Sequence, residues 1–160
     1  MTRWREAGVD EPAAHALLAE YFASRAASFP ASMGEYRTVF PSPEQFVPPH
    51  GVFLVIEGES LEGDDADVGC GGIRRLDGDG PVRFEVKHLW VQPHLRGTGL
   101  GRRLLAELET RARGFGAEEL LLDTNASQAA AAALYRSSGY VEIEPYNDNA
   151  NATNWFAKRL

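Results

Sequence analysis

The sequence predicts an α/β fold of the mixed α+β type, with one mixed, mostly antiparallel sheet and helices on both of its faces. Three strand-like segments, 52–56, 68–76 and 82–91, follow one another with turn residues between them, which is typical of an antiparallel meander. A glycine-rich turn, a helix and the short apolar strand 119–123 come next. This order makes strands 84–91 and 119–123 parallel neighbours in the same sheet.

Composition restricts the class of protein. A chain of 160 residues that is 44% hydrophobic and 24% charged is typical of one soluble globular domain, which we expect to span residues 1–160. The net charge of −7 argues against a nucleic-acid binder. Cys70 is the single cysteine, so neither a disulfide framework nor a thiolate metal cluster is expected. No long apolar segment or signal-peptide pattern is visible, so we expect a cytoplasmic protein with no membrane association.

The N-terminal third alternates between regular and irregular segments. Residues 1–7 favour a short strand, and residues 11–27 favour an amphipathic helix with Asp10 as its cap and Pro12 in its first turn. Residues 28–51 carry several prolines, which forbid long regular elements. This segment is either a substrate wall or the packing of an irregular loop, and the sequence leaves both interpretations open.

The middle of the chain carries the meander and its helix. The run 52–56 predicts a buried strand, the acidic segment 57–67 a solvated hairpin loop, and residues 77–81 a turn. A helix of about 14 residues follows the glycine-rich turn and ends near Gly114 or Gly116. The apolar residues that recur at helical spacing in it are Leu100, Leu104, Leu105, Leu108 and Ala112.

The last 40 residues predict a second helix and two closing strands. Ser127 is the expected cap of a helix that extends to Ser138, and Gly139 is suited to the position just past its end. The chain then returns through strand 140–143 and an asparagine-rich loop, 147–154, to the final strand 155–160.

The glycine-rich turn predicts an anion site. Residues 96–101 contain three glycines, which remove the Cβ atoms that would keep a ligand from the backbone. The helix that follows presents unpaired N–H groups and the positive end of its dipole. Arg96, Arg102 and Arg103 add full positive charges, so a phosphate or pyrophosphate is favoured over a connection without a ligand.

Two nucleotide loops fit this turn poorly. A Walker A loop needs a lysine and a hydroxyl directly after its last glycine, whereas Gly101 is followed by Arg102 and Arg103. A dinucleotide-binding loop needs its third glycine at position 102, and its six-stranded parallel sheet needs more chain than remains.

The motif Arg96-x-x-Gly99-x-Gly101 resembles the R/Q-x-x-G-x-G/A signature of the GNAT superfamily of N-acetyltransferases. The strand before it, FEVKHLWV, and the later NASQAAAAALYRSSGY resemble the corresponding segments of that family, and so does the order of elements. The resemblance is carried by residues 84–140. It implies a V-shaped splay between strands 84–91 and 119–123, and acetyl-CoA as the co-substrate without a metal.

The resemblance also implies which residues hold acetyl-CoA. Backbone amides of the loop hold the pyrophosphate, and the main chain at the splayed strand end, where the family often carries a bulge, binds the pantetheine arm. A family asparagine near the pantetheine corresponds to Gln128 here, with Asn125 three residues earlier. The predicted cofactor-binding residues are Leu89, Trp90, Val91, Arg96, Gly97, Thr98, Gly99, Leu100, Gly101, Arg102, Asn125 and Gln128.

Two residues are the predicted catalytic groups. Tyr135, in LYRSSGY, resembles the family's tyrosine that hydrogen-bonds the coenzyme sulfur and acts as a general acid. Glu85 resembles the catalytic glutamate of the histone-acetylating branch and is the first candidate for the base that takes the proton of the amine. His88 and a chain of water molecules are the alternatives.

The predicted activity is direct transfer of an acetyl group from acetyl-CoA to a primary amine of a small molecule or peptide. The alternative is a non-catalytic acyl-CoA-binding regulatory module with the same fold. The acceptor is expected to contact the first helix, the 28–51 segment and the loop within 145–154, and the family implies a homodimer as a further possibility. Residues placed near the acceptor by position alone are Tyr21, Phe29, Tyr36, Tyr146 and Asn154.

Overall fold

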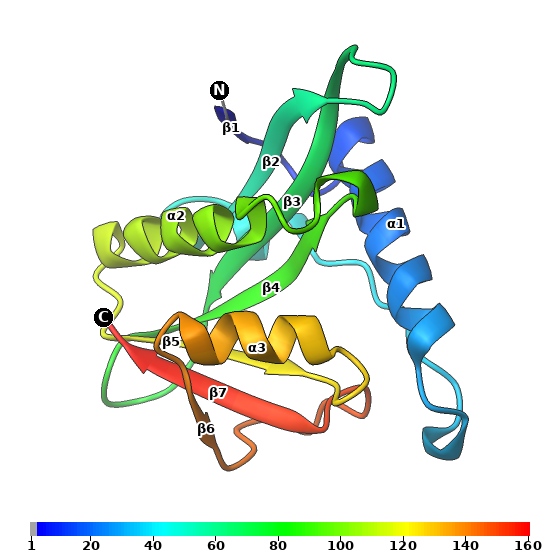
Figure 1. Ribbon diagram of the computed structural model, residues 1–160. Helices are drawn as coiled ribbons and strands as arrows, with labels where there is room; N and C mark the ends of the chain where they lie inside the picture. The colour runs from blue at the N-terminus through cyan, green and yellow to red at the C-terminus, as the bar shows by residue number, and fades with distance from the viewer. Residues whose placement is uncertain (1–2) are drawn as a thin grey trace.

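The computed structural model describes residues 3–160, which fold into one open sheet with helices on both faces (Figure 1). The strands are β1 (Arg3–Glu6), β2 (Gly51–Glu59), β3 (Asp65–Arg75), β4 (Arg83–Val91), β5 (Glu119–Thr124), β6 (Val141–Ile143) and β7 (Asn154–Arg159). The helices are α1 (Pro12–Ser28), α2 (Leu100–Gly114) and α3 (Ala129–Ser137), with 3₁₀ turns at Ala31–Met33, Pro43–Phe46 and Pro93–Leu95.

The seven described strands lie in the order β1-β2-β3-β4-β5-β7-β6. Only β4 and β5 are parallel, as expected for strands joined through a crossover helix. The predicted mixed, mostly antiparallel sheet is therefore confirmed. The first strand covers Arg3–Glu6, and residues 1 and 2 of the predicted segment lie outside the described residues.

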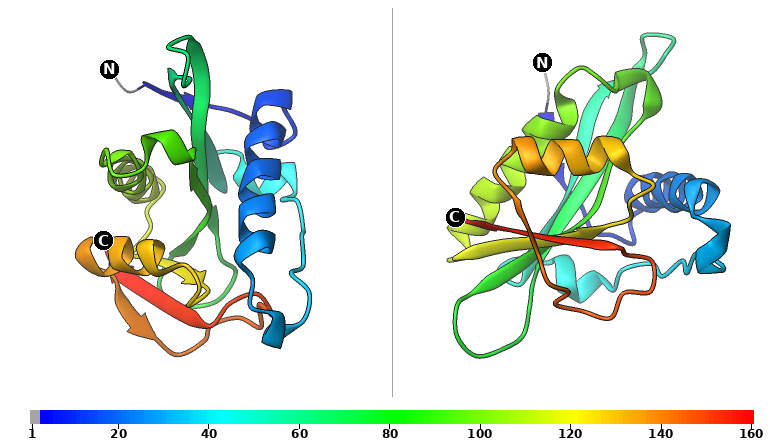
Figure 2. Two further views of the ribbon diagram at one scale, coloured as in Figure 1. Left: turned by 45° about the vertical axis from the view of Figure 1, so that its right-hand side comes forward. Right: turned by 60° about the horizontal axis from the view of Figure 1, so that its bottom comes forward.

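The helices divide into two layers, which Figure 2 shows edge-on, with α1 on one face of the sheet and α2 and α3 on the other. Each layer encloses its own apolar core. Alternation along β2 explains the division, because Val52, Leu54 and Ile56 face α2 whereas Phe53 and Val55 face α1. A strand that is buried on both faces has apolar residues at successive positions, which explains the unbroken apolar run 52–56.

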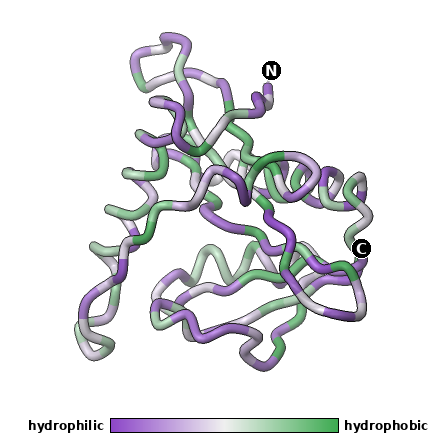
Figure 3. The backbone as a smooth tube through the Cα atoms, turned by 180° about the vertical axis from the view of Figure 1, so that it is seen from behind, coloured by the Kyte–Doolittle hydropathy of each residue, from purple (hydrophilic) through white to green (hydrophobic). Residues whose placement is uncertain are grey.

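The acidic segment 57–67 is mostly strand, which corrects the prediction of a hairpin loop. The strands extend to Glu59 and resume at Asp65, and only the hydrophilic tip between them is loop (Figure 3). Arg5 on β1 explains this extension. Its guanidinium donates to Glu57 over 2.9 Å and to Asp67 over 3.0 Å, which reduces repulsion between the two carboxylates.

The predicted helix caps are wrong by one residue each. Glu11, not Asp10, precedes α1, and Gln128, not Ser127, precedes α3. Neither makes a side-chain cap hydrogen bond, so the start of each helix is set by its packing. None of the helices in residues 3–160 is long and apolar enough to cross a membrane.

The sheet splits between β4 and β5. Their parallel pairing covers only Arg83–Glu85 against Glu119–Leu121, and β5 then continues beside β7. At the same point β4 carries a bulge, because Cys70 and Gly72 of β3 pair with Trp90 and Lys87. His88 lies in this bulge with a φ of 60°, which a non-glycine residue rarely adopts. The edge of β4 beyond Glu85 is therefore open toward β5.

Candidate functional site

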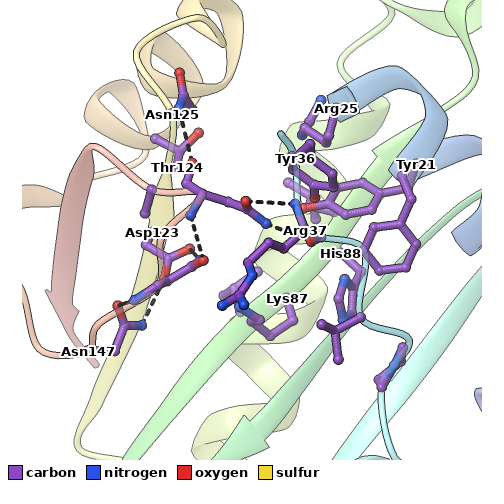
Figure 4. A pocket seen from close by; sticks show the side chains of 18 of the residues that line it. Tyr21, Arg25, Tyr36, Arg37, Lys87, His88, Asp123, Thr124, Asn125 and Asn147 are labelled. Carbon is purple, nitrogen blue, oxygen red and sulfur yellow. Dashed lines mark hydrogen bonds between the residues drawn. The ribbon is translucent and has the colours of Figure 1, made fainter. Parts of the chain in front are cut away.

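A cavity of about 480 Å³ occupies the gap between the split strands. Its walls come from α1, the segment 29–46, the bulged part of β4, the end of β5 and the loop 147–152. Figure 4 shows Asp123, Thr124, Asn125 and Asn147 on the β5 side and the α1 and β4 residues opposite them. The proline-rich segment therefore lines this cavity, and its role as a substrate wall stays a prediction.

Aromatic rings form the α1 side of the cavity. The ring of His88 lies 5.4 Å from that of Tyr21 and 5.5 Å from that of Phe22, both in edge-to-face geometry. Phe46 lies 6.1 Å from His88, and Tyr36 packs 6.5 Å from Phe22. This wall offers a rigid apolar surface to a ligand.

His88 itself is 9% exposed, and its Nδ1 is the one buried side-chain nitrogen or oxygen in residues 3–160 without a hydrogen-bond partner. Burial, together with the positive charges of Lys87 and Arg74, lowers the pKa of His88 to about 3. The imidazole is therefore neutral at physiological pH. A group with so low a pKa is a weak base.

Glu85 is fully buried, but it does not line the cavity. Its Oε1 lies 2.9 Å from Nη2 of Arg74 and 4.0 Å from Nζ of Lys87. Its Oε2 accepts a 2.6 Å hydrogen bond from the hydroxyl of Tyr146 and a 3.4 Å bond from Nδ2 of Asn147. Both carboxylate oxygens are thus occupied by protein donors.

Tyr135 lies at the opposite wall, on α3, where its side chain lines the cavity and is 6% exposed. Its ring packs 6.0 Å from Phe156 and 6.1 Å from Tyr140. Burial raises the pKa of the Tyr135 phenol above its usual value, so the hydroxyl keeps its proton at neutral pH. This state suits a hydrogen-bond or proton donor.

The three predicted β4 residues are divided between the two faces of the sheet. Leu89 and Val91 both pack against the α2 core, and Leu89 also lines the cavity. Trp90 is buried in the α1 core, where its Nε1 donates to Glu20 over 3.4 Å. The main chain of this segment lies at the open edge of β4, where an extended ligand can form hydrogen bonds with it.

The glycine-rich loop lies at the N-terminus of α2. Gly97 and Gly99 have φ angles of 79° and 82°, and no atom of a neighbouring residue lies within 4 Å of the Cβ that either lacks. The first helical hydrogen bond runs from Arg103 N–H to Gly99 O, so the amides of Leu100, Gly101 and Arg102 have no partner within the helix. The loop thus presents open amides to solvent, as an anion site requires.

The side chains around this loop have structural contacts of their own. Thr98 donates to the carbonyl of Leu95 over 2.5 Å, and the guanidinium of Arg96 lies 5.1 Å from the Trp90 ring. Arg102 donates to Ser137 over 2.7 Å and to Ser138 over 3.2 Å, which ties α2 to the end of α3. The loop does not line the cavity and lies outside it.

Asn125 and Gln128 both line the cavity, but their amides already have partners. Asn125 donates to the carbonyl of Asn151 over 3.0 Å. Gln128 accepts a 2.8 Å bond from Arg25 and donates to Ser28 over 2.6 Å, which joins α3 to α1. Contact of either amide with pantetheine stays a prediction.

Sequence reasoning missed Asp123, which lies at the end of β5 and lines the cavity. Its oxygens accept 2.8 Å and 3.2 Å bonds from Asn147 and Asn149, which fixes the asparagine-rich loop. Its position at the carboxyl end of a strand, followed by a loop rich in amides, was the available signal. Arg37 is a second cavity residue that sequence reasoning missed. Its main chain exchanges two hydrogen bonds with the side chain of Asn151.

The residues predicted near the acceptor differ in their positions, and contact of any of them with an acceptor stays a prediction. Tyr21, Phe29 and Tyr36 line the cavity, whereas Tyr146 and Asn154 do not. Tyr146 turns toward Glu85, and Asn154 donates to Glu142 on β6. Within residues 3–160, no group of three or more His, Cys, Asp or Glu side chains is arranged to hold a metal ion.

The structure is that of a mixed α/β protein whose sheet splits beside a glycine-rich helix start, with a cavity in the split. The sequence profile of the Acetyltransferase (GNAT) family matches residues 13–140, which is most of the chain. The protein therefore belongs to the GNAT acetyltransferase family, as the loop and the tyrosine segment predicted.

Solved structures of other acyltransferases are similar to this chain. A Klebsiella pneumoniae protein described provisionally as an acyl-CoA N-acyltransferase is 29% identical and superposes with a TM-score of 0.73 over all of this chain and 98% of its own. A GNAT acetyltransferase of Elizabethkingia anophelis with acetyl-CoA bound shares the fold, with a TM-score of 0.62 at 13% identity over 99% of this chain and 98% of its own.

Sequence similarity to curated relatives is more local. The IAA acetyltransferase of Azospirillum brasilense is 46% identical over 79 residues, which are 49% of this chain and 50% of that protein. The match thus spans about half the length of that relative.

Proposed function

We propose that this protein is an N-acetyltransferase that moves an acetyl group from acetyl-CoA to a primary amine, by direct transfer within a ternary complex. The observation that carries the proposal is the position of the largely buried Tyr135 side chain. It lines the same cavity as Leu89, on the open edge of β4, and that strand leads directly to the anion-binding loop.

The chain's own groups fit acetyl-CoA. The amides at the start of α2 and the charge of Arg96 and Arg103 suit the pyrophosphate. The unpaired edge of β4 beyond Glu85 suits the amides of the pantetheine arm, because an extended chain can add to an open strand edge. Acetyl-CoA supplies the activated acyl group as a thioester.

The reaction forms a C–N bond and breaks the C–S bond of the thioester. The amine must lose a proton, and the leaving sulfur gains one. Tyr135 is suited to the second task, because its raised pKa keeps the phenol protonated until the thiolate develops. A buried donor aimed at developing charge is worth more than the same donor in water.

A water chain fits the first task best among the predicted proton acceptors. Glu85 directs its oxygens toward Arg74, Tyr146 and Asn147, away from the cavity. His88 lines the cavity, but its low pKa makes it a poor base. Direct contact of the amine with Glu85 stays a prediction, which the paired variants described in the Discussion test.

The experiment that tests the proposal measures thiol release from acetyl-CoA in the presence of a panel of primary amines, together with the shift of the melting temperature by acetyl-CoA. We expect turnover with at least one amine and a stabilisation that saturates with acetyl-CoA. Stabilisation without turnover for any amine would instead identify a regulatory module that binds acyl-CoA.

A further inference from the structure

The cavity differs in charge from the rest of the protein. The chain carries a net charge of −7, yet four cationic side chains line the cavity against two carboxylates. The cations are Arg25, Arg37, Arg74 and Lys87, and the carboxylates are Asp123 and Asp148. This excess of cations over carboxylates gives the cavity a positive potential within an acidic protein.

Within residues 3–160, three of these cations, Arg25, Arg37 and Lys87, have no carboxylate oxygen closer than 4.0 Å, and Arg25 is held instead by Gln128 over 2.8 Å. Arg74 is paired with Glu85, whose Oε1 it holds at 2.9 Å. Lys87 reaches that same oxygen only at 4.0 Å, although its side chain is just 20% exposed. No carboxylate in residues 3–160 lies within 4.0 Å of the guanidinium of Arg37. Lys87 is therefore a partly buried cation and Arg37 an exposed one, and the carboxylate of a ligand would supply the counter-ion that both lack.

The nearby carboxylate is engaged elsewhere. Asp123 accepts bonds from Asn147 and Asn149 on the β5 side, which Figure 4 shows across the cavity from Lys87. The cavity therefore offers positive charge on one side, a carboxylate opposite it, and aromatic rings from α1. A ligand complementary to it carries a negative group, an amine and an apolar group.

We propose that the acetyl acceptor is a small primary amine that also carries a carboxylate, in the manner of an α-amino acid with an apolar or aromatic side chain. The carboxylate pairs with Lys87 and Arg37, and the apolar group packs against Tyr21 and Phe22. This inference rests on the proposed function, because it names the substrate class of the same site.

The same charges help the chemistry. The field that Lys87 and Arg74 impose on His88 disfavours an added positive charge in the cavity. An acceptor ammonium on the Lys87 and Arg74 side of the cavity loses its proton more readily than in water, whereas Asp123 on the opposite side favours the ammonium. The attraction of the acceptor carboxylate to Lys87 keeps the amine in place.

The test compares pairs of acceptors that differ only in the carboxylate, such as phenylalanine with phenethylamine and tyrosine with tyramine. We expect kcat/KM to be at least about tenfold higher for each amino acid, the size of one charge-assisted hydrogen bond. In the Lys87→Met protein this ratio should fall toward one, and Arg37→Gln, in an exposed segment, should reduce it in the same direction.

Arg113→Gln is the matched control, because it removes an exposed cation from α2 outside the cavity and should leave the ratio unchanged. Equal rates for both members of a pair, or a preference for the amine without the carboxylate, would overturn the inference while acetyl transfer itself stands. If no amine is acetylated, the proposed function fails. Calorimetric binding of phenylalanine and of phenethylamine in the presence of CoA then decides the inference, and equal affinity overturns it.

Discussion

The hydroxyl of Tyr146 donates a 2.6 Å hydrogen bond to Oε2 of Glu85, across 61 residues of sequence. Together with Arg74 on Oε1, this bond holds the carboxylate away from the cavity that the strand helps to form. The residue that the sequence marks as the first candidate for the base is therefore part of a buried network between β3, β4 and the C-terminal loop.

Variants of the Glu85–Arg74 pair distinguish a structural role of Glu85 from a catalytic role. Glu85→Gln leaves Arg74 without its counter-ion, and we expect a loss of about 2–3 kcal/mol of unfolding free energy, below the value for a fully buried pair because the Arg74 side chain is 30% exposed. Adding Arg74→Met should restore most of the stability, and the turnover of the double variant should match that of Arg74→Met alone. Restored stability with turnover still lost, and a flattened acidic limb of the pH–rate profile, would identify Glu85 as the base.

Tyr135→Phe should lower kcat by about a hundredfold or more, because the leaving sulfur loses its proton donor, with little change in the affinity for acetyl-CoA. Tyr140→Phe is the control, since it removes the hydroxyl of a neighbouring buried tyrosine. That hydroxyl donates to Glu109 over 2.9 Å, so its loss should cost about 1–3 kcal/mol of stability and leave kcat unaltered. Equal kcat for Tyr135→Phe and the unaltered protein would contradict the acid role.

Gly99→Ala should weaken acetyl-CoA binding beyond its effect on stability. Gly99 and Gly116 have φ angles of 82° and 84°, and at both positions the space that a Cβ would occupy has no atom of a neighbouring residue within 4 Å. Alanine at either position should cost about 1 kcal/mol through backbone strain alone. Only Gly99→Ala should raise the KM for acetyl-CoA, because its Cβ and the altered backbone lie at the anion site. Equal KM values for the two variants would remove the loop from the binding site.

His88 should make stability dependent on pH. Its pKa is about 3 in the folded protein and about 6.5 when unfolded, so the unfolded state binds more protons between these values. The free energy of unfolding should therefore fall as the pH decreases from about 6.5 toward 3, by at most about 1.4 kcal/mol per pH unit from this residue. In His88→Gln, chemical denaturation at pH 4 and pH 7 should show a smaller difference. An unchanged difference would show that His88 does not control it.

The sequence predicted those features that depend on interactions between residues close together in the chain. Periodicity set the helices and the covered strands, since each pattern records which face of an element is buried. The glycines at 97 and 99 predicted a backbone without obstructing Cβ atoms, and in the structure both also have positive φ angles. The segment around Tyr135 predicted a buried tyrosine on α3, which lines the cavity.

Contacts between distant segments were beyond the reach of these patterns. The partners of Glu85 and Gln128 are fixed by packing between elements far apart in the chain, and so are the cations that gather beside Lys87. Periodicity fixes the face on which a side chain lies, but not the partner that it meets there. The sequence by itself therefore determined the fold class, the family and the position of the glycine-rich turn at a helix start. Only the tertiary structure decided which carboxylates are occupied and which charges remain for a ligand, because both depend on the distances between side chains from different elements.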